Sequence, residues 1–384
     1  MHFFLPNLNV LYLSIIERRS ISFITLFLSP RITSILLMFS ASDPCIESIV
    51  STVTALPTHC PNLQAITLYF LPRDPIITAA ISDMLLATGR NTLRKFRVDF
   101  PLKEEADEVV CKLPNLCDLS VVIERKTSLP SASLPNLIEL EIICGDGSGW
   151  PGLFHGATFG KLKSVTFRPR SEGIDNFLGT FERVALSSSV QDTLSKSHLF
   201  AFSSWNPNYS SLLPFTQLVD LVIDFPCDYY GCTSTVDDGI VIDLSRAMPK
   251  LISLKLGDVP CKEPMMGVTA KGLVALALHC LDLQHLRVHF QVASLSALPA
   301  SPGICRNTKP TGSWTGCALR ELVVGAIAVP EESVLMVALT LLRIFPRIDD
   351  INSYDDEGWR KVEDAIYLSK RIVGCSGKHP LNTP

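Results

Sequence analysis

The chain has 384 residues, 47% of them hydrophobic and 19% charged, with a formal net charge of −4 at pH 7. A sequence this apolar must bury a large core and cannot remain disordered. Its slightly acidic balance leaves no excess of cations for phosphates or anionic lipids, so composition gives no support to nucleic-acid or membrane-surface binding. The 12 cysteines include no Cys-x-x-Cys pair. This argues against a structural zinc site and favours a reducing compartment, the cytoplasm or the nucleus.

The stretch from Leu8 to Phe39 is apolar, but Glu17, Arg18 and Arg19 interrupt it. Neither apolar piece reaches the roughly 18 uncharged residues that a membrane span requires. The positive charges also follow the first apolar run, whereas in a signal peptide they precede it. We therefore expect no membrane partner.

A short pattern returns along nearly the whole chain: an apolar residue, two others, an apolar residue, one other and a third apolar residue. Four copies follow a Pro-Asn dipeptide and begin at Leu8, Leu63, Leu116 and Leu137. Further copies begin at Ile32, Leu93, Leu162, Leu218, Leu251, Leu283 and Leu319, and weaker ones at Leu194 and Ile348. Successive copies lie about 21 to 36 residues apart, near the period of leucine-rich repeats.

Each copy predicts a short strand, because its last two apolar positions are two residues apart and share one face. Runs with helical spacing lie between copies, at residues 76–88, 103–113, 174–186, 268–280 and 330–345. Strands that alternate with helices predict an α/β fold with a parallel sheet. The recurring frame predicts a leucine-rich-repeat solenoid, a curved parallel sheet whose strands follow chain order with helices on the convex side.

Strands of the form Leu-x-x-Leu-x-Leu, many led by Pro-Asn-Leu, resemble the repeat region of fungal F-box proteins, as does the acidic, aromatic segment Tyr354–Trp359 before a last helix. The resemblance covers almost the whole chain. In that family the repeats hold a protein substrate, while an N-terminal F-box binds the Skp adaptor of a cullin ubiquitin ligase. The resemblance thus implies substrate recognition here, and a Skp-type adaptor only if an F-box lies upstream of the first repeat.

We expect the solenoid to span residues 1–356, and a capping helix and tail to fill residues 357–384. Trp359, Val362 and Ile366 should face the last strand, because they share one side of that helix. Residues 291–316 contain prolines, glycines and serines with little periodicity, so they predict a long exposed insertion.

Residues that flank the apolar positions of a strand would line the concave surface of a solenoid. We expect a partner protein to bind there, on charged or imidazole side chains of four strands: Lys95, Arg97, Asp99, Glu139, Glu141, Asp220, Asp224, His285, Arg287 and His289. Carboxylate pairs act as acid and base only where they converge in a closed pocket, which an open sheet does not provide. His285 and His289 would lie about 13 Å apart, too far to share a metal ion. We therefore expect no catalytic residue, cofactor or metal.

Two alternatives fit parts of the sequence. Residues Gly147 to Gly152 spell the Gly-x-Gly-x-x-Gly fingerprint of nucleotide-binding α/β enzymes, although Pro151 and the residues after it do not predict the helix that must meet the phosphates. A secreted or membrane-anchored repeat receptor would need the N-terminus to act as a signal. The interpretation that accounts for most of the chain is a non-enzymatic protein-interaction scaffold.

Overall fold

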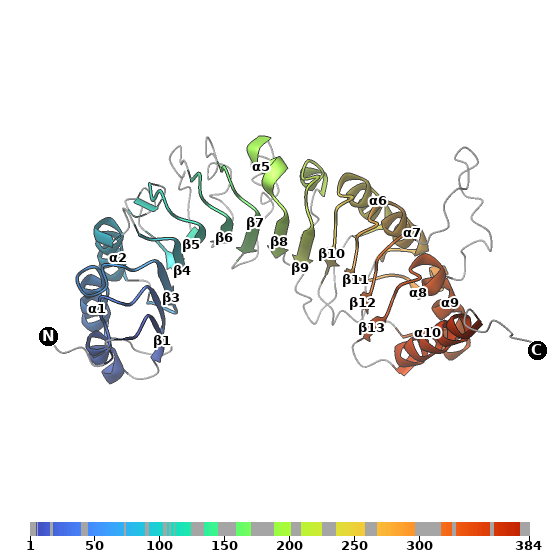
Figure 1. The fold of residues 1–384 in the computed structure, drawn as a ribbon, viewed down its shortest axis with the longest axis horizontal. Helices are drawn as coiled ribbons and strands as arrows, with labels where there is room; N and C mark the ends of the chain where they lie inside the picture. Colours follow the sequence, from blue (N-terminus) through green and yellow to red (C-terminus); the bar gives the residue numbers. More distant parts are fainter. Residues whose placement is uncertain are drawn as a thin grey trace, which may run out of the picture. The chain divides into compact units, whose positions relative to one another are not determined.

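A computed structural model describes residues 5, 7–15, 18–39, 45–72, 74–88, 92–102, 106, 109–110, 112–123, 134–144, 159–169, 188–200, 209–224, 236–257, 267–295, 316–324, 328–353 and 357–376. Within these ranges the chain forms short parallel strands joined by helices and turns, an α/β fold (Figure 1). It divides into two compact units, Met1–Leu194 and Ser195–Pro384.

The first unit contains strands that pair in parallel and in chain order: β1 (Val10–Ile15), β2 (Ser34–Phe39), β3 (Ala65–Tyr69), β4 (Lys95–Pro101), β5 (Asp118–Ile123), β6 (Glu139–Cys144) and β7 (Ser164–Pro169). Its helices are η1 (Arg18–Leu26), α1 (Ile46–His59), α2 (Pro75–Thr88) and α5 (Ser188–Thr193). Helix α1 packs against both η1 and α2. Parallel pairing requires every connection to return the chain to the same end of the sheet, and these helices lie within the connections.

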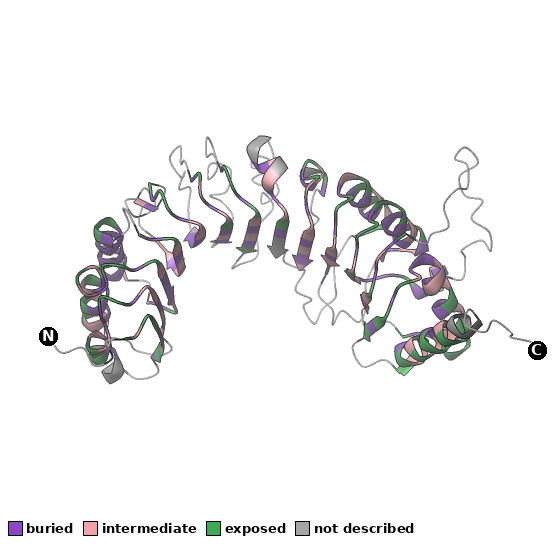
Figure 2. Cartoon of the chain, in the orientation of Figure 1, coloured by how far each residue is buried: buried purple, intermediate pink, exposed green. Residues whose placement is uncertain are grey.

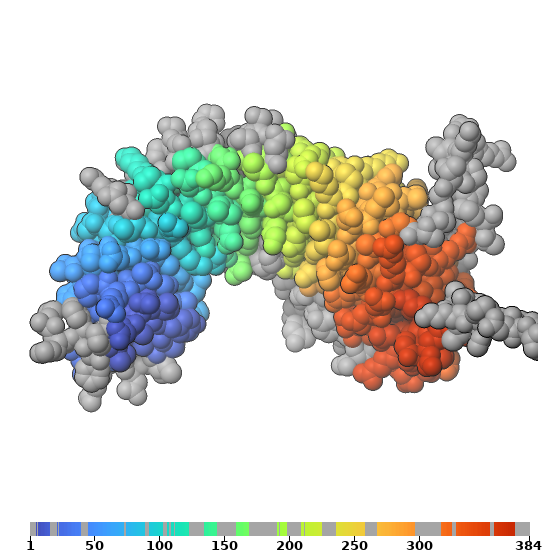
Figure 3. All heavy atoms as spheres, viewed as in Figure 1, coloured from blue at the N-terminus to red at the C-terminus, as the bar shows by residue number. Residues whose placement is uncertain are grey.

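The second unit repeats this arrangement with β8 (Lys196–Phe200), β9 (Asp220–Asp224), β10 (Ser253–Leu256), β11 (His285–Val288), β12 (Glu321–Val324) and β13 (Asp350–Ser353), again parallel and in chain order. Its helices are η3 (Tyr209–Leu212), α6 (Asp238–Ala247), α7 (Ala270–His279), α8 (Val292–Leu295), η4 (Glu331–Ser333), α9 (Val334–Ile344) and α10 (Glu357–Ser376). Helix α6 packs on α7, and α9 packs on α10. Figure 3 shows that stretches adjacent in sequence stay adjacent in space within this unit.

The strands predicted from the repeated frame are confirmed, and within each unit neighbouring copies form neighbouring strands. Three of the predicted helices also match, as α2, α7 and η4 with α9. Residues 174–186 lie outside the described part of the chain, and residues 103–113 are described only in part. Helix α6 was not predicted.

The core lies on one face of each sheet, because burial alternates along the strands. In β4, Phe96, Val98 and Phe100 are at most 2% exposed, while the residues between them are partly exposed. We call the face formed by these intervening residues the open face. Buried residues are drawn purple in Figure 2. Ser197 of β8 is an exception to the apolar frame, since it occupies an inward position beside Leu221 and is buried.

A backbone turn precedes several strands, and in two repeats an asparagine side chain bonds to the preceding repeat. The Leu63 amide donates to the Cys60 carbonyl at 3.1 Å, and Leu283 donates to Cys280 in the same way at 3.2 Å. Both cysteines are buried, three residues before their copy begins. The asparagine of Pro-Asn-Leu donates to the preceding repeat, as Asn62 Nδ2 does to the Pro30 carbonyl at 3.0 Å. The motif therefore joins one repeat to the next.

The last helix, α10, packs against β13 and α9. Trp359, Val362 and Ile366 are buried on that side as expected, and the Trp359 ring meets Phe290 edge to face at 5.7 Å. The segment at residues 291–316 differs from expectation where it is described. Val292 and Leu295 of α8 are buried, so the start of this segment belongs to the core; residues 296–315 lie outside the described ranges.

Candidate protein-interaction face

Register brings the same frame position of successive strands into rows across the open face. In the first unit one row contains Lys95, Asp118 and Glu139, and the next contains Arg97, Ser120 and Glu141. Directly opposed side chains on adjacent strands are close enough to interact. Residues about 20 positions apart in the sequence thereby become neighbours.

An ion-pair network joins these rows. Arg97 Nε and Nη2 donate to the two carboxylate oxygens of Asp118, each at 2.8 Å, and Lys95 Nζ lies 2.9 Å from the same carboxylate. Arg97 Nη2 also lies 3.2 Å from Glu139. Burial lowers the pKa of Arg97, but the hydrogen bond and negative charge of Asp118 outweigh it, so the pKa is raised overall. The guanidinium is held in place as a permanent cation.

The two remaining charged residues predicted for this unit, Glu141 and Asp99, also have partners. Arg168 Nε lies 2.9 Å from Glu141. Asp99 accepts a hydrogen bond from the Phe70 amide at 2.8 Å, at a residue with a φ of 59°. That left-handed conformation is unusual for an aromatic residue, so Asp99 supports the backbone there. The charged side chains predicted for the first unit are therefore engaged within the protein, mainly by Asp118, Arg168 and the backbone.

Large apolar side chains are exposed on the open face of β1 and just after β3. Val10 and Tyr12 of β1 are 56% and 61% exposed, and Phe70 just after β3 is 65% exposed. Tyr12 and Met38 lie in contact across β1 and β2. These strands supply no charged residue to the open face.

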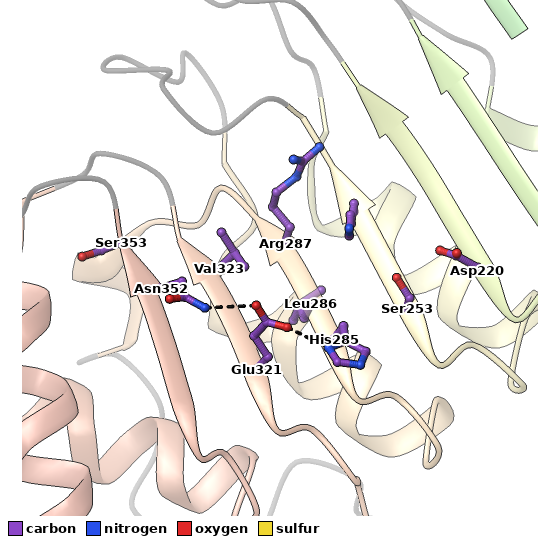
Figure 4. Close-up of a pocket in the computed structure, with 10 residues that line it drawn as sticks. Asp220, Ser253, His285, Leu286, Arg287, Glu321, Val323, Asn352 and Ser353 are labelled. Atoms are coloured by element: carbon purple, nitrogen blue, oxygen red, sulfur yellow. Dashed lines mark hydrogen bonds and ion pairs between the residues drawn. The ribbon is translucent and has the colours of Figure 1, made fainter. Parts of the chain in front are cut away.

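In the second unit the open face is arranged differently. His285 Nδ1 lies 2.8 Å from Glu321 Oε2, and Asn352 Nδ2 donates to Glu321 Oε1 at 3.0 Å, which links β11, β12 and β13. Arg287 forms an ion pair with Asp224 of β9. Each of these contacts joins residues on two different strands. Figure 4 shows the hydrogen bonds that link His285, Glu321 and Asn352 across the sheet.

These side chains surround a hollow of about 710 Å³ on the open face of β9–β13 (Figure 4). It is lined mainly by polar and charged residues: Asp220, Ser253, Lys255, His285, Leu286, Arg287, Glu321, Val323, Asn352 and Ser353. Its volume falls in the range of ligand-binding sites. It lies on the open face of the sheet.

Two groups in this hollow have no hydrogen-bond or ion-pair partner among the described residues. Among the residues that the structure describes, no ion pair or hydrogen bond engages the Lys255 ammonium. Within the same set, Asp220 Oδ1 is buried and accepts no hydrogen bond. Desolvated polar atoms without a partner are rare in folded proteins and call for an explanation.

His289 does not lie where we expected it. Strand β11 ends at Val288, and His289 is only 9% exposed. Its carbonyl accepts a hydrogen bond from Val268 at 3.1 Å, and Phe290 bridges to Val268. The chain therefore turns toward the segment before α7, which ends the strand alternation that would have exposed the imidazole.

The other predicted residues lie on the open face in two separate groups, one on β4 and β6 and one on β9 and β11. Sequence reasoning missed the residues that complete both groups, Asp118, Lys255 and Glu321. The signal was present, since each sits in the repeated frame beside an inward leucine. Reading charges along single strands could not find pairs that form across strands.

The described residues give no support to a nucleotide site, a metal site or a membrane span. Gly147 to Gly152 lie outside the described residues. No group of three potential metal ligands converges in the described ranges. None of the helices described combines the length and apolar character that crossing a bilayer requires.

Comparison with models of protein families and with curated proteins finds no match.

Proposed function

We propose that the chain is a leucine-rich-repeat solenoid that acts as a non-enzymatic scaffold and binds another protein on its open face. A parallel sheet in chain order with one buried face and a recurring Leu-x-x-Leu-x-Leu frame supports the repeat class. The observation that carries the function is the hollow on β9–β13, where polar side chains from five adjacent strands meet. Binding residues in repeat proteins vary on such a surface while the core frame is kept.

Within this proposal, the most specific role is substrate recognition for a cullin ubiquitin ligase, through a Skp-type adaptor bound to an upstream F-box. The resemblance of the Pro-Asn-Leu repeats to fungal F-box proteins supports this role. Free, buried Cys60, Cys280 and Cys317 accord with a reducing compartment, the cytoplasm or nucleus.

Site-specific photo-cross-linking tests the scaffold. A photoreactive amino acid would replace Val323 on the open face or, as a matched control, Leu339, which is 51% exposed on α9. Each protein is irradiated in an extract of the cells that make it. We expect a discrete protein adduct from position 323 and none from position 339. Adducts of the same proteins at both positions, or only at position 339, would contradict binding on the open face.

A further inference from the structure

Two cations face each other in the hollow of the second unit. Lys255 of β10 and Arg287 of β11 are direct partners in the parallel register. Like charges directly opposed on adjacent strands destabilise a sheet. Asp224 compensates Arg287, but no described residue compensates Lys255, so this pair leaves one positive charge in excess.

The surroundings of the two cations strengthen their effect. Along the same row, Val222 lies beside Lys255 and Val323 beside Arg287. The Arg287 side chain is only 20% exposed, and its Nε is buried without a hydrogen-bond partner among the residues described. Charges next to apolar, partly desolvated surface attract an anion more strongly than charges in open water. This row of the hollow therefore favours an incoming negative group.

The neighbouring row limits how much negative charge can enter. In strand order it contains Asp220, Ser253, His285, Glu321 and Asp350. Glu321 is occupied by His285 and Asn352, whereas Asp220 Oδ1 accepts no bond within the described ranges. A polyanion such as a nucleic acid would meet these carboxylates. A ligand that places a single carboxylate over Lys255 and a basic group beside Asp220 would avoid this repulsion.

We propose that the hollow anchors an extended segment of a partner protein through one aspartate or glutamate side chain, bound by Lys255 and Arg287, with a basic residue of the same segment beside Asp220. The carboxylate accepts charge-assisted hydrogen bonds from the two cations. The segment crosses β9–β12. This inference rests on the proposed scaffold function and specifies the chemistry of its partner.

Oriented peptide libraries test the anchor with the purified full chain. The immobilised peptides carry Glu, Gln, phosphoserine or Lys at a fixed central position and degenerate neutral residues elsewhere, and retained protein is measured. We expect the Glu library to retain about fivefold more protein than the Gln library, as a partly desolvated ion pair provides. Lys255→Gln should remove this preference. Lys271→Gln, which neutralises an exposed lysine at the start of α7, should keep it.

A second pair of libraries tests the role of Asp220. Adding a lysine two positions from the fixed Glu should increase retention by the natural chain, and Asp220→Asn should abolish that increase. Circular dichroism checks that each variant folds.

Equal retention of the Glu and Gln libraries, or an equal loss in the Lys255 and Lys271 variants, would overturn the anchor. Retention of phosphoserine peptides without Glu peptides would replace the carboxylate by a phosphate and also overturn it. Cross-linking from position 323 separates this failure from a wider one. If adducts form there while the libraries show no preference, only the acidic anchor is wrong; if no adduct forms, the scaffold itself is wrong.

Discussion

The open faces of β4–β7 and of β9–β12 carry charges at equivalent frame positions but pair them differently. In the first, Lys95 and Arg97 share the Asp118 carboxylate, and Arg97 also pairs with Glu139. In the second, Lys255 faces Arg287, and it has no partner among the described residues. The core positions are equivalent in both regions, so the fold does not depend on this difference. Charges that the protein satisfies internally stabilise it, and charges that it leaves unsatisfied are available to a partner.

The largest expected effect should be the same in both regions, because it concerns the shared core. Leu119→Ala in β5 and Leu254→Ala in β10 should each lower the free energy of unfolding by about 2 to 5 kcal/mol, since each leaves a cavity among buried side chains. Urea denaturation measures the change. Ser253→Ala, on the open face beside Leu254, is the control and should change stability by less than about 0.5 kcal/mol. Equal losses in all three variants would contradict the assigned faces.

The second prediction concerns the ion pairs of the first unit. Asp118→Asn should destabilise the chain by roughly 1 to 3 kcal/mol, because it leaves Lys95 and Arg97 side by side without their shared carboxylate. Glu321→Gln in the second unit removes a more exposed pair with His285 and should cost no more than about 1 kcal/mol. Both are read from urea denaturation, and the difference between them should shrink at high salt. A larger loss in the Glu321 variant would reverse the comparison.

The third prediction is a near absence of effect on stability. Lys255→Gln should leave the free energy of unfolding within about 0.5 kcal/mol of the natural chain, since no described residue depends on its charge and a repulsion with Arg287 is removed. Thermal unfolding followed by circular dichroism measures this. A loss comparable to that of Asp118→Asn would mean that Lys255 has a structural role in the second unit.

The smallest expected effect is the alkylation of Cys60 and Cys280, which occupy equivalent positions of the repeat in the two units. Burial raises the pKa of Cys60 to about 11 and that of Cys280 to about 12. Alkylation requires the thiolate, so at pH 8 both should remain unmodified while the half-buried Cys45 and Cys117 react before them. Mass spectrometry after a brief iodoacetamide pulse identifies the modified sites. Rapid labelling of Cys60 or Cys280 in the folded chain would contradict their burial.

The sequence predicted the parallel strands because a period-2 pair of apolar residues recurs in one register. It did not predict α6. Helix α6 contains Gly239, and glycine disfavours helix formation locally. Burial of Val241 and Leu244 in α6 overrides that local preference, and tertiary packing of this kind cannot be inferred from a local window.

The candidate site was predicted in outline only. The open-face positions of Arg97 and Arg287 follow from the strand frame, but their partners Asp118 and Asp224 lie on other strands and depend on register. His289 was placed incorrectly because the end of β11 is set by the bridge from Phe290 to Val268. A frame read along one strand indicates which side chains face outward. It does not indicate where the strand ends or which outward charges meet.

One paired measurement tests the central claim most directly, that the open face of the second unit is the one left free for a partner. The cross-linking yield from position 323 and the free energy of unfolding are measured together for Asp118→Asn and Lys255→Gln. We expect Asp118→Asn to lower stability and keep the yield, and Lys255→Gln to keep stability and lower the yield. If Lys255→Gln left the yield unchanged, or if both variants altered stability alone, the claim would be wrong.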